Sequence, residues 1–224
     1  MNSVKTAIAA TAFIGTTALA GTVNVGIDQS DAPWLAFMNV FELPENGGGF
    51  VFGSGWGIAD LTASFDDGAS TLTMGPNTVG DPDPFWYQGG GGPGAPGNKF
   101  MEANLYQQVD GGLAGQTVTF EGTVLSNTFT DAHDARVFIR DFAADFSSSV
   151  DVFADVDAAG NFSISLDTID DASRHVQWGI QVSGENVWIT DVDPFGTIVF
   201  GTVPTPGSLA MLGLGGLIAT RRKR

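Results

Sequence analysis

The feature that most constrains this chain is a two-residue alternation of apolar and polar side chains in its second half. Val118, Phe120 and Val124 face one way along 116–124, while the threonines between them face the other. The same pattern recurs at 135–141, 150–156, 161–166, 175–182, 186–192 and 197–200. Clusters rich in Gly, Asp and Asn separate these segments. Many short strands at such spacings predict a β-sandwich or a barrel.

The first half is less regular. We predict strands at 34–43, 50–52, 59–65 and 70–74, followed by a long loop at about 75–98 that holds five of the ten prolines. Residues 21–203 are therefore predicted to form one all-β domain, a jelly-roll or galactose-binding-like β-sandwich of about eight to ten strands. The strand rhythm of 99–203 resembles carbohydrate-binding-module-like sandwiches of exported bacterial proteins.

Residues 1–20 have the layout of a secretory signal peptide. Lys5 is their one charge, an Ala-rich apolar run follows, and Ala18-Leu19-Ala20 has the small-x-small form that signal peptidase recognises. We expect cleavage after Ala20, with the mature chain beginning at Gly21.

Residues 204–224 form a second signal. Pro204, Thr205 and Pro206 precede an uncharged stretch that ends at Thr220, and the chain closes on a basic cluster of Arg221, Arg222, Lys223 and Arg224. The stretch predicts a short transmembrane helix with its basic end in the cytoplasm. This layout resembles the PEP-CTERM sorting signal, although Thr205 stands where that family usually has Glu. The resemblance implies processing by an exosortase-type enzyme, an exported location in the cell envelope or outside the cell, and at least transient anchoring in the inner membrane.

Charge narrows the choice of partner. Residues 21–203 carry all 25 acidic side chains against four basic ones, Lys99, Arg136, Arg140 and Arg174, a net charge of −21. Nucleic acid is excluded because a duplex-binding protein needs a basic footprint. Like charges repel, so the sequence favours a neutral or cationic glycan over an acidic one. The absence of Cys excludes thiol catalysis and Cys-ligated metal centres.

Aromatic side chains are the best candidates for ligand contacts, because sugars stack on them while polar groups bind the hydroxyls. The predicted ligand-binding residues are Trp86, Tyr87, Gln88, Asn104 and Tyr106. For Trp86 and Tyr87, which lie in the Pro/Gly loop, packing that anchors the loop is an equally good interpretation. Four other tryptophans, at positions 34, 56, 178 and 188, are predicted to belong to the core.

No catalytic signature is found. Neither His133 nor His175 belongs to a recognisable triad, and no cofactor is predicted. A structural calcium ion is an open alternative, with Asp28, Asp31, Asp191 and Asp193 as donors. We therefore predict a non-enzymatic envelope or matrix protein that binds polysaccharide or builds the surface. The alternative is a glycoside hydrolase or lyase that uses paired acids such as those at 66–67, 81 and 83, 170–171 or 191 and 193.

Overall fold

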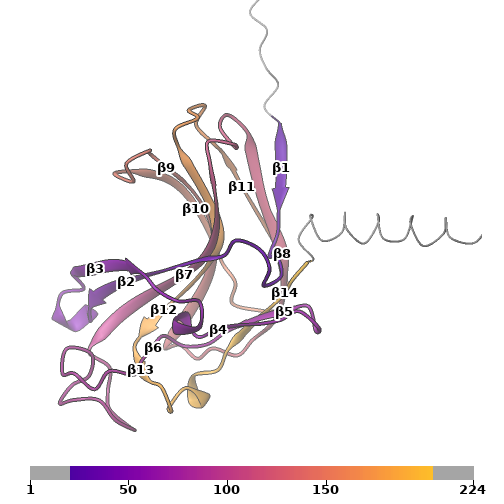
Figure 1. The fold of residues 1–224 in the computed structure, drawn as a ribbon. Helices are drawn as coiled ribbons and strands as arrows, with labels where there is room; N and C mark the ends of the chain where they lie inside the picture. Colours follow the sequence, from indigo (N-terminus) through magenta and orange to yellow (C-terminus); the bar gives the residue numbers. More distant parts are fainter. Residues whose placement is uncertain (1–20, 204–224) are drawn as a thin grey trace, which may run out of the picture.

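The alternating segments of the sequence form strands in two large sheets (Figure 1). The structure is a computed structural model that describes residues 21–203. The predicted signal peptide and sorting tail, with Ala18, Ala20, Pro204–Pro206 and Arg221–Arg224, lie outside that range. The strands are β1 (Thr22–Val25), β2 (Leu35–Glu42), β3 (Phe50–Gly55), β4 (Ala63–Asp66), β5 (Thr71–Met74), β6 (Thr78–Val79), β7 (Lys99–Asp110), β8 (Thr117–Asn127), β9 (His133–Phe142), β10 (Ser149–Asp155), β11 (Gly160–Asp167), β12 (His175–Glu185), β13 (Val187–Trp188) and β14 (Ile198–Gly201).

One sheet is organised around β8 and is called here the β8 sheet. β11 pairs antiparallel along one edge of β8, and β1 and β14 follow each other along its other edge. β5 and β4 continue the sheet beyond β14. A bulge between Val199 and Phe200 interrupts the pairing of β14 with β8.

The other sheet has the strand order β10-β9-β12-β7-β2-β3, is antiparallel throughout, and is called the β12 sheet. Its long strands bend, so that the sheet curves with its concave side toward the left of Figure 1. A small parallel pair, β13 with β6, lies beside it.

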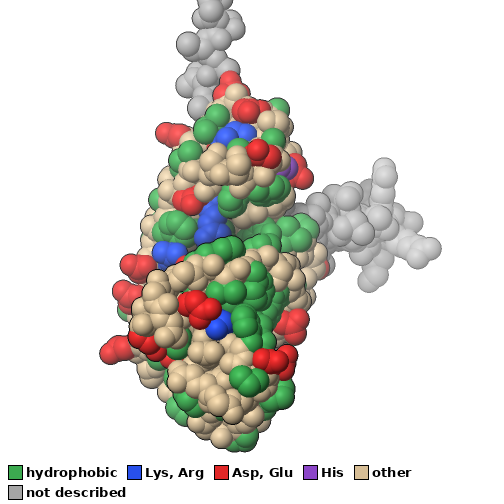
Figure 2. All heavy atoms as spheres, turned by 90° about the vertical axis from the view of Figure 1, so that its left-hand side faces the viewer, with side chains coloured by type: hydrophobic (Ala, Val, Ile, Leu, Met, Phe, Trp, Pro, Cys, Tyr) green, Lys and Arg blue, Asp and Glu red, His purple; other side chains and the backbone are tan. Residues whose placement is uncertain are grey.

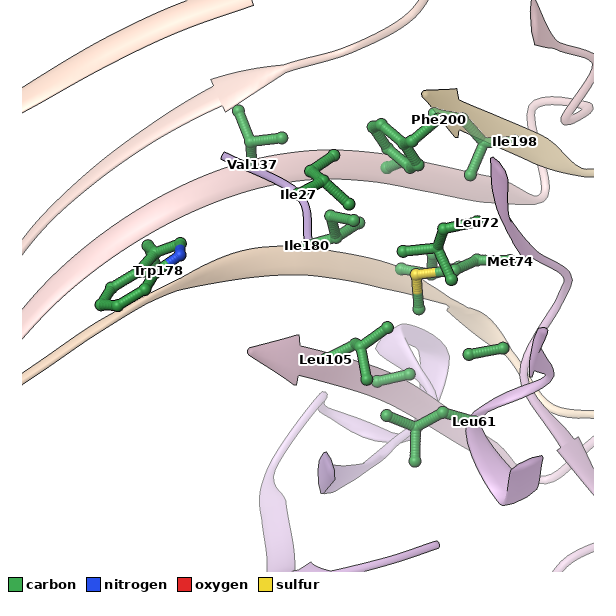
Figure 3. Packing of buried hydrophobic residues seen from close by; sticks show 14 of the residues in the cluster. Ile27, Leu61, Leu72, Met74, Leu105, Val137, Trp178, Ile180, Ile198 and Phe200 are labelled. Carbon is green, nitrogen blue, oxygen red and sulfur yellow. The ribbon is translucent and has the colours of Figure 1, made fainter. Parts of the chain in front are cut away.

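The core lies between the two sheets (Figure 3). Val137, Ile180 and Leu105 point inward from the β12 sheet, and they meet Phe200 and Leu72 from the β8 sheet. All five side chains have no exposed surface. Each side chain of this kind contributes about 1.5–3 kcal/mol when it is fully buried. The alternation in the sequence thus places one face of every long strand in this shared core.

The sandwich is confirmed, and several details of the prediction are corrected. The described chain has fourteen strands, because β1 and β6 lie outside the predicted strands and β7 was not singled out. Ala59–Leu61 is a 3-10 turn that precedes β4. Of the strand predicted at 186–192 only β13 forms. After it the chain turns, and the Asp191 amide donates to the Trp188 carbonyl. Within residues 21–203, no helix is long and apolar enough to cross a membrane.

Candidate functional site

The Pro/Gly loop packs its aromatic side chains inward. Tyr87 is completely buried, and its hydroxyl donates to the Val79 carbonyl while lying 2.9 Å from the Val187 carbonyl. Burial raises the pKa of its phenol, and its ring meets Trp188 edge-on at 5.3 Å. The prediction of Tyr87 as an exposed sugar contact is therefore wrong: it anchors the loop.

Trp86 and Gln88 serve the same loop. The Trp86 ring is half-buried and packs edge-on against Phe52, Trp56 and Phe85. Its carbonyl accepts from the buried amide of Asn186. Gln88 is exposed, but its amide nitrogen donates to the Gly97 carbonyl across the loop, at 3.0 Å. These contacts support the loop-anchoring interpretation of Trp86, because its ring packs against its neighbours and is not a free, flat platform for a sugar.

The other two predicted ligand residues, Asn104 and Tyr106, lie elsewhere, on the hollow outer face of the β12 sheet. The outer face is organised in cross-strand rows, because residues directly opposite each other share a face. The three central rows are Gln108, Gln177, Arg140 and Asp151; Tyr106, Gly179, Phe138 and Phe153; and Phe37, Asn104, Gln181 and Arg136. A groove of about 590 Å³ runs over these rows. We call it the concave groove, and its lining residues are Phe37, Asn39, Asn104, Tyr106, Gln108, Arg140, Phe142, Phe146, Ser149, Asp151 and Gln177.

A hydrogen-bond network fixes the floor of the concave groove. The Asn104 side-chain oxygen accepts from Arg140 at 3.0 Å and from Gln181 at 2.8 Å. The Gln181 oxygen in turn accepts from the Arg136 guanidinium at 2.6 Å. Asn104 and Gln181 are buried, although no other element of the described chain covers this face. The network therefore holds Arg140, which lines the groove, in a fixed orientation.

Glycine makes room in the middle of this floor. Gly179 lies between Tyr106 and Phe138 in its row, and a Cβ there would come within 2.2 Å of the Leu105 carbonyl oxygen and 2.7 Å of the Tyr106 Cα. Its missing side chain lets β12 and β7 approach closely. The half-buried Tyr106 ring lies beside Gly179, and burial raises the pKa of its phenol.

Exposed aromatic side chains end the groove at the β9–β10 hairpin. Phe146 is 51% exposed, and its backbone adopts φ +58°, a left-handed conformation that is uncommon for an aromatic residue. Its ring stacks on His175 at 4.5 Å with an interplanar angle of 3°. Asp110 lies 2.6 Å from the His175 ring, and this contact raises the pKa of the imidazole and lowers that of the carboxyl. The strained backbone thus holds an apolar ring at the groove in spite of its exposure.

Basic side chains also gather on this face, whereas most acidic side chains lie toward its margin (Figure 2). The Arg140 guanidinium lies over the rings of Phe138 and Phe153, at 4.2 and 5.2 Å, and Arg136 lies over Phe153 at 4.2 Å. These contacts hold both side chains flat against the wall of the sheet. Burial lowers the pKa of Arg140, although Asp151 and Glu102 oppose that effect.

The predicted calcium donors are spread over separate segments. Asp28 accepts from Gln107 at 2.9 Å, Asp191 accepts from the Gly94 amide at 2.6 Å, and Asp193 is exposed in a 3-10 turn; Asp31 is exposed in the turn after β1. Residues 21–203 contain no group of three His, Asp or Glu side chains that could hold a metal ion. The structure therefore does not bring these donors together, and calcium stays a prediction.

The paired acids of the enzyme alternative fall outside the concave groove. Asp66 ends β4, the others of the pairs at 66–67, 81 and 83, 170–171, and 191 and 193 are in turns or short connections, and none of them lines the groove. Asp66, Asp83 and Asp171 instead accept from backbone amides two or three residues ahead, as turn residues do.

The sequence prediction missed most of the groove. Arg140, Gln177, Gln181 and Phe146 were not among the candidates, although the first three alternate with apolar residues on their strands. The sequence feature that could have identified them is the composition of two strands. Two of the four bases of the domain, Arg136 and Arg140, stand on one face of β9, and two glutamines, Gln177 and Gln181, stand on one face of β12.

Comparison with known proteins gives only distant likenesses. No family model and no curated protein matches the sequence. Among solved structures, the carbohydrate-binding module TmCBM61 in complex with β-1,4-galactotriose is 9% identical, with a TM-score of 0.32 over 75% of this chain and 83% of that one. A CBM4 structure is 14% identical, with a TM-score of 0.32 over 78% and 88%. The CBM22-1–GH10 modules of Clostridium thermocellum xylanase 10B, complexed with xylohexaose, are 11% identical, with a TM-score of 0.26 over 49% and 23%. Likenesses at this level identify no ligand for this chain.

Proposed function

We propose that this protein is a non-enzymatic polysaccharide-binding protein and that the concave groove is its binding site. The observation that carries the proposal is the buried network of Asn104, Gln181 and Arg140 on a sheet face that no other described element covers. Proteins bury polar groups where they are satisfied and where they serve a purpose. Here the purpose is to present oriented donors and acceptors to a hydroxyl-rich ligand.

Sugar chemistry matches the two kinds of surface in the groove. A sugar ring has an apolar C–H face and an equatorial belt of hydroxyl groups. Tyr106 and Phe146 offer rings for the first, and Gln108 and Gln177 offer hydrogen-bond partners for the second. An open groove, unlike a closed cavity, lets a polymer extend beyond the site.

A binding assay tests this assignment. Full-length protein is screened against an array of plant, bacterial and algal polysaccharides, and the retained glycans are then titrated with Tyr106→Ala. We expect Tyr106→Ala to weaken retention at least tenfold. Thr119→Ala, on the exposed outer face of β8, is the matched control and should bind like the wild type. Equal loss in both variants, or retention that is indifferent to Tyr106, would refute the groove as the site.

We also infer that the chain is exported and sorted by its two ends. The support is in the sequence: Ala18-Leu19-Ala20 precedes Gly21, and Pro204-Thr205-Pro206 precedes an apolar stretch and Arg221–Arg224. Signal peptidase and an exosortase-type enzyme are the partners that this layout requires, and the cell envelope or the extracellular matrix is the destination.

Protein chemistry on the native protein tests the export proposal. The N-terminal sequence of the envelope fraction should begin at Gly21, and a retained Met1 would contradict it. Replacing the four terminal bases with Gln should change the localisation and the C-terminal mass. If both stay the same, the tail is not a sorting signal.

A further inference from the structure

The basic side chains of the domain differ in how their charge is balanced. Lys99 pairs with Glu42 at 3.0 Å, and Arg174 pairs with Asp141 at 2.8 Å. Arg136 lies 3.7 Å from Glu102. Among residues 21–203, Arg140 is the only Lys or Arg side chain without an ion pair. In a domain of net charge −21, an unpaired guanidinium is unexpected.

The guanidinium of Arg140 is also partly removed from water. Its guanidinium rests on two aromatic rings, and its one hydrogen bond goes to a neutral acceptor, the Asn104 oxygen. A guanidinium has five N–H donors, so several remain for the groove that Arg140 lines. Burial lowers the pKa of Arg140 in spite of nearby acids, which agrees with a charge that the folded protein leaves incompletely balanced.

The acids near Arg140 do not supply the missing partner. Asp151 is opposite Arg140 on β10, but it is exposed and makes no ion pair with it. Glu102 is already engaged by Arg136, and Asn39 donates to it at 3.3 Å. Asp151 also lines the groove, but as an exposed carboxylate it is screened by solvent and salt, whereas a ligand group bound on Arg140 is shielded from both.

From this we propose that the groove selects an acidic glycan, with the carboxylate of a uronic acid unit bound by the Arg140 guanidinium and the neighbouring hydroxyls bound by Gln177 and Gln108. The inference rests on the proposed function and narrows its ligand class. It replaces the expectation of a neutral or cationic glycan, which followed from net charge alone. A planar carboxylate accepts two parallel N–H bonds from a guanidinium, and such charge-assisted pairs are about twice as strong as neutral ones.

The test uses polygalacturonate, alginate and glucuronoxylan, each beside its carboxyl-reduced form, in which every uronate has become the neutral sugar. Full-length protein should retain at least one acidic polymer, and carboxyl reduction should weaken that retention tenfold or more. Arg140→Gln should cause the same loss on the acidic polymer and little loss on the reduced one. Arg136→Gln, whose charge already faces Glu102, should have the smaller effect.

The outcomes separate the two levels of the proposal. If the reduced or other neutral glycans bind as tightly as the acidic polymers, and Arg140→Gln weakens both equally, the acidic-glycan inference is overturned while polysaccharide binding stands. If no polysaccharide of any charge is retained, the proposed function itself fails. Should Arg140→Gln not fold, judged by its melting curve, Arg140→Lys replaces it. That variant keeps the charge but loses the planar fork, and an unchanged affinity would contradict the bidentate contact.

Discussion

The two outer faces of this sandwich share one periodicity and differ in everything else. On the β8 sheet, Thr117, Thr119 and Thr123 face Asp167, Ser165 and Asn161 across the strands, and each pair is hydrogen-bonded and exposed. On the β12 sheet the equivalent positions carry long polar side chains and aromatic rings, and several of them are buried.

This difference indicates that the polar residues of the β8 face interact with water, whereas those of the β12 face are arranged for a ligand. Short polar side chains on the β8 sheet satisfy each other locally and stay exposed to water. On the β12 sheet, Asn104 and Gln181 have lost contact with water, because the arginine side chains of the same face contact them. Because desolvating polar groups costs free energy, a face built this way needs a compensating network and a use.

The largest expected change in stability comes from adding a side chain at Gly179, where β12 and β7 approach closely. Gly179→Ala brings a Cβ against backbone atoms of Leu105 and Tyr106, so β12 and β7 must separate. We expect the free energy of unfolding to fall by about 3 kcal/mol in urea titrations. Ser165→Ala, on the exposed face of the β8 sheet, is the control and should change it by less than about 0.5 kcal/mol. Equal, small effects would mean that the two faces are built alike.

The next largest effect is a pH dependence that any binding study of the groove must separate from ligand chemistry. His133 is buried between Phe129 and Phe195, and burial lowers its pKa to about 4. Unfolded His133 takes up a proton near its ordinary pKa of 6.5, so acid favours the unfolded chain. Stability should fall by about 2.5 kcal/mol between pH 7.5 and 4.5 because of this residue alone.

Melting curves across this pH range check the effect. His133→Phe keeps an aromatic ring in the cluster and should flatten the slope between pH 6.5 and 4.5. His175→Gln is the contrast, because Asp110 raises the pKa of His175 and gives it the opposite sign: its contribution to stability is present at low pH and lost as the pH rises through its folded pKa. An unchanged slope in His133→Phe would show that carboxylates alone cause the acid sensitivity.

The sandwich was predictable because alternation reports which side of a strand is apolar. Val118 and Phe120, or Val176 and Ile180, define their inner face without any tertiary knowledge. What alternation does not report is which outer face is hollow. Gln177 and Thr119 both count as polar outward residues, and only the bend of the β12 sheet turns one of them into the lining of a groove. The aromatic loop was misjudged for a related reason: the neighbours that bury Tyr87 are Val79, Val187 and Trp188, and the last two are a hundred residues away.

A smaller effect distinguishes the loop from the groove. Tyr87→Phe removes the hydroxyl that serves the Val79 and Val187 carbonyls and keeps the ring. Because the buried Val79 carbonyl loses its donor, we expect a loss of about 1.5 kcal/mol in the free energy of unfolding, measured by urea titration. Glycan retention by the folded protein should not change. If Tyr87→Phe retained less glycan with an unchanged free energy of unfolding, the loop would have to be part of the binding site.

The smallest effect on stability should accompany a clear effect on binding. Phe146→Ala removes an exposed ring from the end of the concave groove, and its packing on His175 and Phe142 is at the surface. We expect the free energy of unfolding to change by about 0.5 kcal/mol or less, since the left-handed backbone at this position strains Ala as well. Retention of the bound glycan should weaken by roughly threefold to tenfold, the range of a lost ring-stacking contact of about 0.5–1.5 kcal/mol. Phe50→Ala is the matched control, because Phe50 is 63% exposed at the far edge of the same sheet and does not line the groove. If both variants weaken retention to the same degree, exposed aromatic surface in general explains binding, and the assignment of the concave groove as the binding site is contradicted.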